Sequence, residues 1–327
     1  MNNIKHLENI RSSKVLITGG LGFVGHNLAK SLIHDYNCEV TILDNMLNSK
    51  ESILKDIGGS PTFINASVID VPLEGFLEHF DYIFHLACIQ IAHSGKDPFL
   101  DLQTNATSTL RILEYLRHHE HNIKRFVYTS SASVYGNAQN GLCVESGPTK
   151  VLSQYASTKL LGENYTSIYF KQYGVPTSSV RYSNVFGNGQ TPQNTYCGVI
   201  GKFINASVEN QELFIFGDGQ QTRDYTYISD AVSATILAAV HPLSMGEVFN
   251  VGTGTETSVN ELAEMIIDYT GSKSNIGYHP PRDIDNIRRR FTDINSIQDR
   301  LGWEPAVTIQ RGLKFTIDWY NNQPKED

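Results

Sequence analysis

The stretch Lys14-Val-Leu-Ile-Thr-Gly-Gly-Leu-Gly-Phe-Val-Gly25 decides the fold of this chain. It opens with a short apolar run, typical of a buried parallel strand, and a helical pattern begins directly after it at His26. Between them, Gly19 permits a tight turn, Gly22 lets the backbone approach a pyrophosphate, and Gly25 lets the helix pack closely on the strand. The stretch therefore predicts a dinucleotide site with the phosphates at the helix N-terminus. The alternative is a glycine turn without a ligand.

An acidic residue at the end of the second predicted strand indicates which dinucleotide is bound. The strand Glu39-Val-Thr-Ile-Leu-Asp44 ends 19 residues after Gly25, where a carboxylate would accept hydrogen bonds from the adenosine ribose. A carboxylate repels a 2′-phosphate, and no arginine follows Asp44 directly. The pattern therefore favours NAD over NADP, and the alternative is a solvated aspartate at the strand end.

Strands and helices alternate along the first half of the chain. The region 99–119 is predicted to be an amphipathic helix, and 153–173 is predicted to be a second long helix. The apolar stripe of the first helix consists of Leu102, Ala106, Leu110, Leu113 and Leu116. Further strands are predicted at 61–65, 82–87, 125–129 and 175–180. This alternation is typical of an α/β fold with a doubly wound parallel sheet.

Tyr155-Ala-Ser-Thr-Lys159 places a phenol and an ammonium one turn apart on one helix face. The ammonium favours the phenolate and lowers the tyrosine pKa toward working pH, which makes Tyr155 a candidate general acid/base for a sugar hydroxyl. Ser131, at the end of a predicted strand, would hold the same hydroxyl and relay its proton. A Tyr-x-x-x-Lys match is weak alone, and the glycine turn and serine-rich strand end upstream give it weight.

The composition sets limits on partners and location. The chain has 327 residues, of which 40% are hydrophobic and 18% charged, as in ordinary globular proteins. A net charge of −8 argues against bulk binding to nucleic acid or an anionic membrane. No signal-peptide pattern or membrane-length apolar run is present. The four cysteines are scattered without metal-ligand spacing, which predicts no metal site and a cytoplasmic protein.

These motifs, with others downstream, resemble the extended short-chain dehydrogenases/reductases of the NAD-dependent nucleotide-sugar epimerase/dehydratase group, in particular the UDP-glucose 4-epimerases. The resemblance runs from about residue 14 to about residue 315. It is carried by Gly19, Gly22 and Gly25, His85-Leu-Ala87, Ser130-Ser131, Val134-Tyr135-Gly136, Tyr155 and Lys159, Arg181-Tyr-Ser-Asn184-Val-Phe-Gly187, Phe216-Gly-Asp-Gly219, Gln221-Thr-Arg223-Asp224, Phe249-Asn-Val-Gly252, and Leu301-Gly-Trp303 with Pro305.

The resemblance implies an architecture and a cofactor site. A Rossmann-type NAD-binding domain is expected over 1–182, with 225–255 returning to it. A smaller mixed α/β domain over 183–224 and 256–327 is expected to bind the nucleotide sugar. A homodimer is expected to form through the helices at 99–119 and 153–173. The implied NAD contacts are Gly19, Gly22, Phe23, Val24, Gly25, Asp44, Asn45, Ser67, Val68, Leu86, Ala87, Tyr155 and Lys159.

The resemblance also implies roles around the sugar. Tyr155 takes the proton from O4 while hydride passes from C4 to the nicotinamide, and Lys159 binds the nicotinamide ribose. Phe216 stacks on the base and Arg223 pairs with the diphosphate; the alternatives are a core Phe216 and an Arg223 that pairs with Asp224. The implied substrate-binding residues are Ser131, Ser133, Asn184, Val199, Phe216, Arg223, Arg282, Asp285 and Arg290.

Departures from relatives narrow the reaction. Dehydratases place an Asp-Glu pair directly after the active-site Ser/Thr, where this chain has Ala132 and Ser133. UDP-glucuronate decarboxylases carry a glutamate at the position of Ser133. A UDP-hexose 4-epimerase therefore fits best. The alternatives are a same-fold epimerase or reductase for another nucleotide sugar (an N-acetylhexosamine, a uronate, or a CDP- or GDP-sugar) and a non-catalytic NAD-binding protein.

One position is expected to sense the substituent at C2 of the sugar. Counting along the resemblance places Arg290 there, and its size predicts a preference for UDP-glucose and UDP-galactose over their N-acetyl forms. Two alternatives remain: a flexible arginine that swings into solvent, and a guanidinium that binds a uronate carboxylate.

Overall fold

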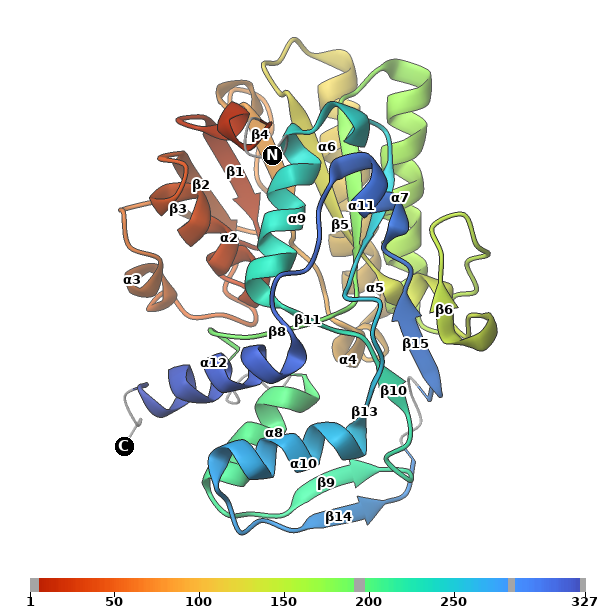
Figure 1. The fold of residues 1–327 in the computed structure, drawn as a ribbon. Helices are drawn as coiled ribbons and strands as arrows, with labels where there is room; N and C mark the ends of the chain where they lie inside the picture. Colours follow the sequence, from red (N-terminus) through yellow and green to blue (C-terminus); the bar gives the residue numbers. More distant parts are fainter. Residues whose placement is uncertain (1–5, 191–197, 282–285, 324–327) are drawn as a thin grey trace.

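The computed structural model describes residues 6–190, 198–281 and 286–323. A seven-stranded sheet forms its centre, and all neighbouring strands are parallel, which confirms the predicted α/β fold (Figure 1). The strand order is β12-β7-β5-β4-β1-β2-β3. The strands are β1 (Lys14–Thr18), β2 (Glu39–Asp44), β3 (Thr62–Asn65), β4 (Tyr82–His85), β5 (Arg125–Ser131), β7 (Thr177–Tyr182) and β12 (Val248–Val251).

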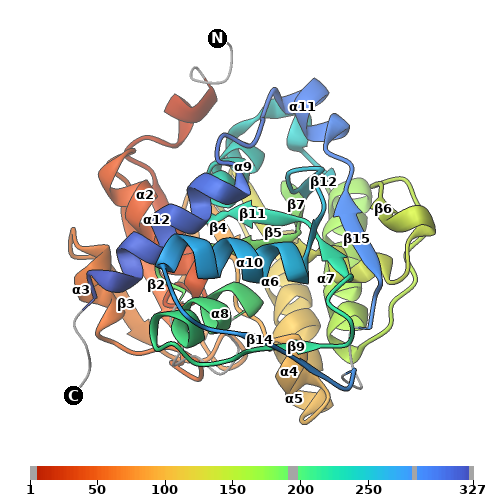
Figure 2. The same ribbon diagram turned by 60° about the horizontal axis from the view of Figure 1, so that its bottom comes forward.

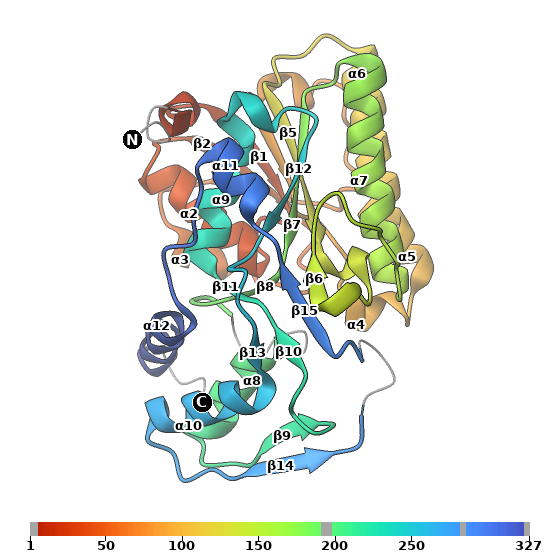
Figure 3. The ribbon, with the colours of Figure 1, turned by 45° about the vertical axis from the view of Figure 1, so that its right-hand side comes forward.

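Helices cover both faces of the central sheet (Figure 3). On one face lie α2 (Phe23–His34) and α9 (Ile228–Val240), and on the other lie α6 (Ser108–His118) and α7 (Gln154–Tyr173). Successive side chains of a strand point to opposite faces, so β1 supplies Ile17 to the first core and Leu16 to the second. This is the doubly wound arrangement that the sequence predicted.

The second half of the chain adds a smaller mixed α/β lobe below the carboxyl ends of the central strands (Figures 1 and 2). One four-stranded sheet has the order β13-β10-β15-β6, and two further sheets pair β11 with β8 and β14 with β9. These elements are β6 (Leu142–Cys143), β8 (Asn184–Phe186), α8 (Val199–Val208), β9 (Leu213–Phe216), β10 (Thr222–Arg223), β11 (Tyr225–Tyr227), β13 (Thr257–Ser258), α10 (Val259–Thr270), β14 (Ile276–His279), β15 (Arg289–Thr292) and α12 (Ile309–Asn321).

Segments of the second half also return to the central sheet. β12 pairs with β7, and α9 packs against α2, whereas β15 pairs with β6 of the first half. The exact domain boundaries given above stay a prediction. The remaining described helices are η1 (Glu8–Ile10), α3 (Ile53–Ile57), η2 (Leu77–His79), α4 (Ile91–Ser94), η4 (Ala132–Tyr135), η5 (Gln139–Gly141), η6 (Pro242–Ser244) and α11 (Asn295–Leu301).

The helix predicted over 99–119 contains an irregular turn. It consists of α5 (Pro98–Leu102), a π-helical turn η3 (Gln103–Thr107) and then α6. A π turn holds more residues than an α turn, so it rotates the residues before it relative to those after it. Leu113 and Leu116 are buried as predicted, but Leu102 is 41% exposed and its neighbour Asp101 is buried instead. Leu102, which the sequence placed on the same apolar stripe as Leu113 and Leu116, therefore lies off their buried face.

Candidate active site

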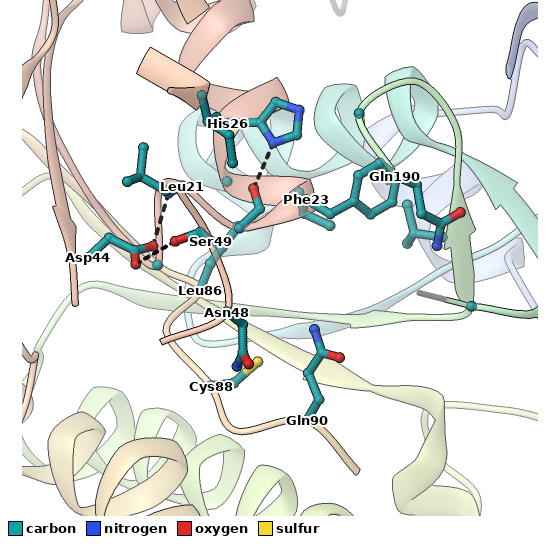
Figure 4. Close-up of a pocket in the computed structure, with 18 of the residues that line it drawn as sticks. Leu21, Phe23, His26, Asp44, Asn48, Ser49, Leu86, Cys88, Gln90 and Gln190 are labelled. Atoms are coloured by element: carbon teal, nitrogen blue, oxygen red, sulfur yellow. Dashed lines mark hydrogen bonds between the residues drawn. The ribbon is translucent and has the colours of Figure 1, made fainter. Parts of the chain in front are cut away.

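A cleft of about 1890 Å³ opens where the central strands end at their carboxyl side (Figure 4). The chain runs outward from β1 to β2 and β3 and then crosses back to β4 on the other side of β1. The β1/β4 boundary is thus the point at which the strand order reverses, where open α/β sheets bind their ligands. Ligand pockets commonly measure 300–1,000 Å³, so this cleft has room for a dinucleotide and a second ligand.

The glycine turn after β1 forms the floor of this cleft. Gly19 has a φ of +69°, and a Cβ added there would lie 2.7 Å from the backbone nitrogen of Ala87. A Cβ on Gly25 would lie 2.3 Å from the carbonyl oxygen of Gly19. Gly22 is the N-cap of α2, so no side chain covers the first amides of that helix. Glycine is therefore needed for the turn and the close packing, and the exposed amides suit a pyrophosphate.

Asp44 forms the side of the cleft next to the glycine turn. Its carboxylate accepts hydrogen bonds from the backbone nitrogens of Leu21 (3.0 Å) and Met46 (2.8 Å) and from the hydroxyl of Ser49 (3.1 Å), and two of these bonds are drawn in Figure 4. Asp44 is thus a fixed acceptor in the cleft wall and not a freely solvated aspartate. A fixed carboxylate here suits the hydroxyls of an adenosine ribose.

All the predicted cofactor residues line this one cleft. They come from the glycine turn and from the ends of β2, β3 and β4, together with the start of α7. The set comprises Gly19, Gly22, Phe23, Val24, Gly25, Asp44, Asn45, Ser67, Val68, Leu86, Ala87, Tyr155 and Lys159. Their individual contacts with NAD stay predictions.

Ser131, Tyr155 and Lys159 lie together in the cleft wall. Ser131 ends β5, and the Ser153 hydroxyl caps α7 by accepting a hydrogen bond from Ala156 N at 3.1 Å, which orients the first turn carrying Tyr155. Burial raises the pKa of Tyr155, and the Ser131 hydroxyl acts in the opposite direction. The expectation that Lys159 brings the Tyr155 pKa to working pH is therefore not met in the protein alone, because burial outweighs the favourable neighbours.

Tyr128, which the sequence analysis did not single out, packs against the side chain of Lys159. The lysine is 2% exposed, and its Nζ lies 4.9 Å from the ring centroid of Tyr128. The Tyr128 hydroxyl donates to the carbonyl oxygens of Asn105 (3.1 Å) and of Lys159 itself (3.3 Å). Burial lowers the pKa of Lys159, while the face of the ring favours the ammonium. Nothing in the local sequence around Tyr128 distinguishes it from an ordinary core residue.

The predicted substrate residues divide into two groups. Ser131, Asn184 and Val199 line the cleft. Ser133 is 9% exposed, and its hydroxyl donates to the Ser131 oxygen at 3.0 Å, so it lies directly behind Ser131. Arg282 and Asp285 lie outside the described residues.

The remaining predicted substrate residues lie in the smaller lobe, away from the described lining of the cleft. Phe216 is 45% exposed at the end of β9, which excludes the alternative of a core residue. Arg223 is buried and donates to the carbonyl oxygen of Ile287 at 2.7 Å. Asp224 accepts hydrogen bonds from the hydroxyls of Thr253 (2.7 Å) and Thr292 (2.6 Å). The Asp224 carboxylate is thus already satisfied by hydroxyl donors.

Arg290 is buried in β15. This strand pairs in parallel with β10, and Arg290 lies opposite Arg223 in that pairing. With 7% of its surface exposed it does not swing into solvent, so that alternative is wrong for this structure. Its positive charge acts to lower the pKa of Tyr155, in the same direction as the Ser131 hydroxyl and against the effect of burial.

The cleft contains further residues that the sequence analysis did not assign. Gln90 projects into it from the segment after β4, together with Cys88, and Gln190 lies across from them (Figure 4). Gln90 is polar and accessible, whereas its neighbour Ile89 is buried. Of the two neighbours Ile89 and Gln90, Gln90 is therefore the one whose side chain can hydrogen-bond a ligand.

The comparisons with known proteins agree with this geometry. A model of the NAD-dependent epimerase/dehydratase family matches residues 15–252. This chain belongs to that family. The UDP-glucose 4-epimerase of Mycolicibacterium smegmatis is 34% identical to it over 95% of this chain and 99% of that protein.

Solved structures of this family superpose closely on the chain. UDP-N-acetylglucosamine 4-epimerase from Methanobrevibacter ruminantium, in complex with UDP-N-acetylmuramic acid, has a TM-score of 0.89 and 32% identity, covering 96% of this chain and 100% of that one. UDP-glucuronic acid 4-epimerase from Bacillus cereus, in complex with UDP-glucuronic acid and NAD, has a TM-score of 0.86 and 27% identity, covering 94% and 99%.

Membership of the NAD-dependent epimerase/dehydratase family makes NAD the cofactor, and the glycine turn and Asp44 fit it. Within the described ranges, no cluster of three or more His, Cys, Asp and Glu side chains could hold a metal ion. None of the helices in those ranges is long and apolar enough to cross a membrane. The family members named above act on different nucleotide sugars, so the substrate has to be inferred from this chain's own residues.

Proposed function

We propose that this enzyme inverts C4 of a UDP-hexose, interconverting UDP-glucose and UDP-galactose through a transient 4-keto sugar. The observation that carries the proposal is the set of Ser131, Tyr155 and Lys159 in one cleft with a dinucleotide cradle. Bound NAD supplies a hydride acceptor that returns the hydride to the other face of the sugar. The protein then has only to bind, orient and move one proton.

The protein residues have separate tasks in this proposal. The Tyr155 phenolate takes the proton from the sugar O4, and Ser131 holds the same hydroxyl in line. Burial lowers the pKa of Lys159, and the Tyr128 ring and the Asp101 carboxylate act in the opposite direction, toward its charged form. Since burial raises the pKa of Tyr155, the phenolate needs additional positive charge, which the oxidised nicotinamide ring supplies when NAD is bound.

The residues after Ser131 support an epimerase over a dehydratase. Ala132 and Ser133 begin the short helix η4 and are 4% and 9% exposed. Neither side chain can serve as the carboxyl acid or base that loss of water requires. The Ser133 hydroxyl instead donates to Ser131 and so orients the catalytic serine.

Turnover of candidate substrates tests the proposal directly. Purified protein is incubated with UDP-glucose, UDP-N-acetylglucosamine and UDP-glucuronate without added NAD, and the products are separated by chromatography. We expect conversion of UDP-glucose to UDP-galactose, because the enzyme should purify with NAD bound. Conversion of only another sugar would contradict the UDP-hexose assignment, and conversion of none would contradict the activity.

A uronate epimerase is the second candidate, and Arg290 favours it. A buried guanidinium whose charge acts on Tyr155 suits a paired hydrogen bond with a carboxylate at C6 of the sugar. The Bacillus cereus enzyme, which binds UDP-glucuronic acid, shows that the fold accommodates such a sugar. The UDP-glucuronate arm of the turnover experiment separates the two candidates.

The proposal includes a cytoplasmic homodimer formed through the helices α5 to α7. Their outer surface exposes Phe99 (78%), Leu102 (41%) and Ile168 (41%), an apolar set that a second copy would cover around a two-fold axis. Cys38, Cys88 and Cys143 are free thiols, as in a reducing compartment. Light scattering at micromolar concentration should give the mass of a dimer, and a monomer would contradict this interface.

A further inference from the structure

A buried carboxylate next to the catalytic residues has no part in the chemistry described so far. Asp101, the fourth residue of α5, has none of its surface exposed. The helix in which it lies packs against α7, which carries Tyr155 and Lys159. Burial of a charged aspartate costs folding free energy, because the carboxylate loses its hydration on leaving water.

Two of the donors to Asp101 belong to the elements around Tyr155 and Lys159, and the Ser94 hydroxyl also acts on its carboxylate. One carboxylate oxygen accepts from Asn105 Nδ2 at 2.6 Å, and the other accepts from the Thr158 hydroxyl at 2.9 Å. Thr158 lies immediately before Lys159 in α7. Asn105 lies in the π-helical turn and also bonds both backbone groups of Ile89, at 2.7 Å and 3.1 Å. Asp101 therefore joins α7 to the segment beside the cofactor cradle.

These contacts suit the ionised form of Asp101. The amide nitrogen of Asn105 can only donate, and the Thr158 hydroxyl has one proton to give. A carboxylate accepts both bonds, one on each oxygen. Burial raises the pKa of Asp101, and the hydrogen bond from Thr158 acts in the opposite direction.

We propose that Asp101 is a positioning residue for the catalytic pair: it fixes the first turn of α7 through Thr158 and places a buried negative charge beside Tyr155 and Lys159. The inference rests on the proposed role of Tyr155 as general acid/base. The charge favours the ammonium form of Lys159 against the effect of burial, and it offsets part of the positive charge that favours the Tyr155 phenolate. Asp101 thereby sets the pH at which Tyr155 gives up its proton.

Other groups also influence the pKa values of Tyr155 and Lys159, so a test of Asp101 has to leave them unchanged. Cys88 approaches from the segment after β4, and Arg290 from β15. Lys159 and Tyr128 lie beside Tyr155 on α7 and β5, and His85 of β4 feels the charge of Lys159. Asp101→Asn removes the charge and keeps the size of the side chain, so it leaves all of these groups in place.

The test is a titration of Tyr155 in Asp101→Asn, loaded with oxidised NAD and without sugar. Near-ultraviolet absorbance of the phenolate is recorded against pH, and the same protein carrying Tyr155→Phe is subtracted. We expect the pKa of Tyr155 to fall by roughly one unit, because removing a nearby negative charge favours the phenolate. The pH profile of kcat/KM should move to lower pH by the same amount.

The matched control is Asp97→Asn, because Asp97 is an exposed acid that caps α5 by accepting from Leu100 N at 2.9 Å. Asparagine also caps helices, so this variant removes the same charge outside the site and should not shift the titration. An unshifted Asp101→Asn, equal shifts in both variants, or lost turnover without a shift would overturn the proposal.

Two further outcomes are covered by the design. If Asp101→Asn does not fold, Asp101→Ser removes the charge and leaves room for water, and failure of both to fold would show a purely structural role and overturn the proposal. A wild type that converts no UDP-sugar would contradict the proposed function, while the sugar-free titration would still decide the role of Asp101.

Discussion

The two sides of the cleft are built in different ways. On the cofactor side, the glycine turn, Asp44 and the strand ends after β3 and β4 all meet at one edge of one parallel sheet. On the proposed sugar side, in the smaller lobe and outside the described lining of the cleft, Phe216 is 45% exposed on β9, and Arg223 and Arg290 come from two strands of a separate sheet. The cofactor side thus follows from one repeated local unit, and the sugar side depends on how distant segments come together.

This difference shows where substrate choice can change without loss of the chemistry. Glycines at the cofactor side are surrounded by backbone, so substitution there disturbs the turn itself. Residues at the sugar side project from short strands of the smaller lobe, where side chains can vary while the sheet persists. Variants on the cofactor side should therefore lose NAD affinity, whereas variants on the sugar side should change the preference among sugars.

The largest effect is expected at Tyr155, where the two sides meet. Tyr155→Phe should lower kcat by roughly 10²–10⁴-fold, the usual contribution of general acid–base catalysis, because the phenylalanine cannot accept the O4 proton. NAD content should change little, since the ring remains in place. Steady-state kinetics and assay of the nucleotide released on denaturation measure the two effects.

Tyr173→Phe is the matched control, because Tyr173 lies at the far end of α7 and is 43% exposed. It should keep wild-type kcat and NAD content. Near-normal turnover of Tyr155→Phe would contradict its role as general acid/base. Loss of NAD from the same variant would show that Tyr155 acts in cofactor binding.

A smaller effect is expected at Asp44, on the cofactor side alone. Asp44→Asn should weaken NAD binding by roughly 10- to 100-fold, because a hydrogen bond to a charged group is worth about 1.5–3 kcal/mol. The wild type should bind NAD in preference to NADP, and the variant should lose most of that preference. Equilibrium binding of both dinucleotides measures this.

Asp35→Asn controls for the lost charge, since Asp35 is an exposed acid at the end of α2. It should leave both affinities unchanged. Thermal unfolding accompanies the Asp44 measurement, because the carboxylate also holds Leu21 and Ser49. A wild type that prefers NADP, or an Asp44→Asn variant with unchanged affinities and stability, would contradict the role of Asp44.

The same contrast explains what the sequence could predict. The strand, glycine turn and helix from Lys14 to His34 were predictable because each step depends on neighbouring residues. The π-helical turn was not, because its extra residue has no signature in the apolar pattern, and so the sequence placed Leu102 on the apolar stripe although Asp101 is the buried residue. The pKa of Tyr155 was also missed, because burial by the rest of the fold outweighs the local charge.

The smallest effect is expected at Arg290, on the sugar side. Arg290→Ser should raise kcat/KM for UDP-N-acetylglucosamine relative to UDP-glucose by roughly tenfold, since extra room for small groups is typically worth about 1–3 kcal/mol. The arginine is 7% exposed and held in β15, so serine opens space inside the protein and not at its surface. Activity on UDP-glucuronate, if the wild type has it, should fall instead, because a carboxylate would lose its guanidinium partner.

Arg288→Ser is the control, because Arg288 precedes the same strand but is 60% exposed and pairs with Asp218 at the surface. It should leave the ratio of the three UDP-sugars unchanged, since surface ion pairs contribute little. The kcat/KM values of wild type and both variants for UDP-glucose, UDP-N-acetylglucosamine and UDP-glucuronate measure the effect. A wild type that already prefers the N-acetyl sugar, or an unchanged ratio in Arg290→Ser, would show that Arg290 is not a size filter. Substrate choice would then have to come from the cleft wall around Gln90, and the sugar side would depend on the central sheet as the cofactor side does.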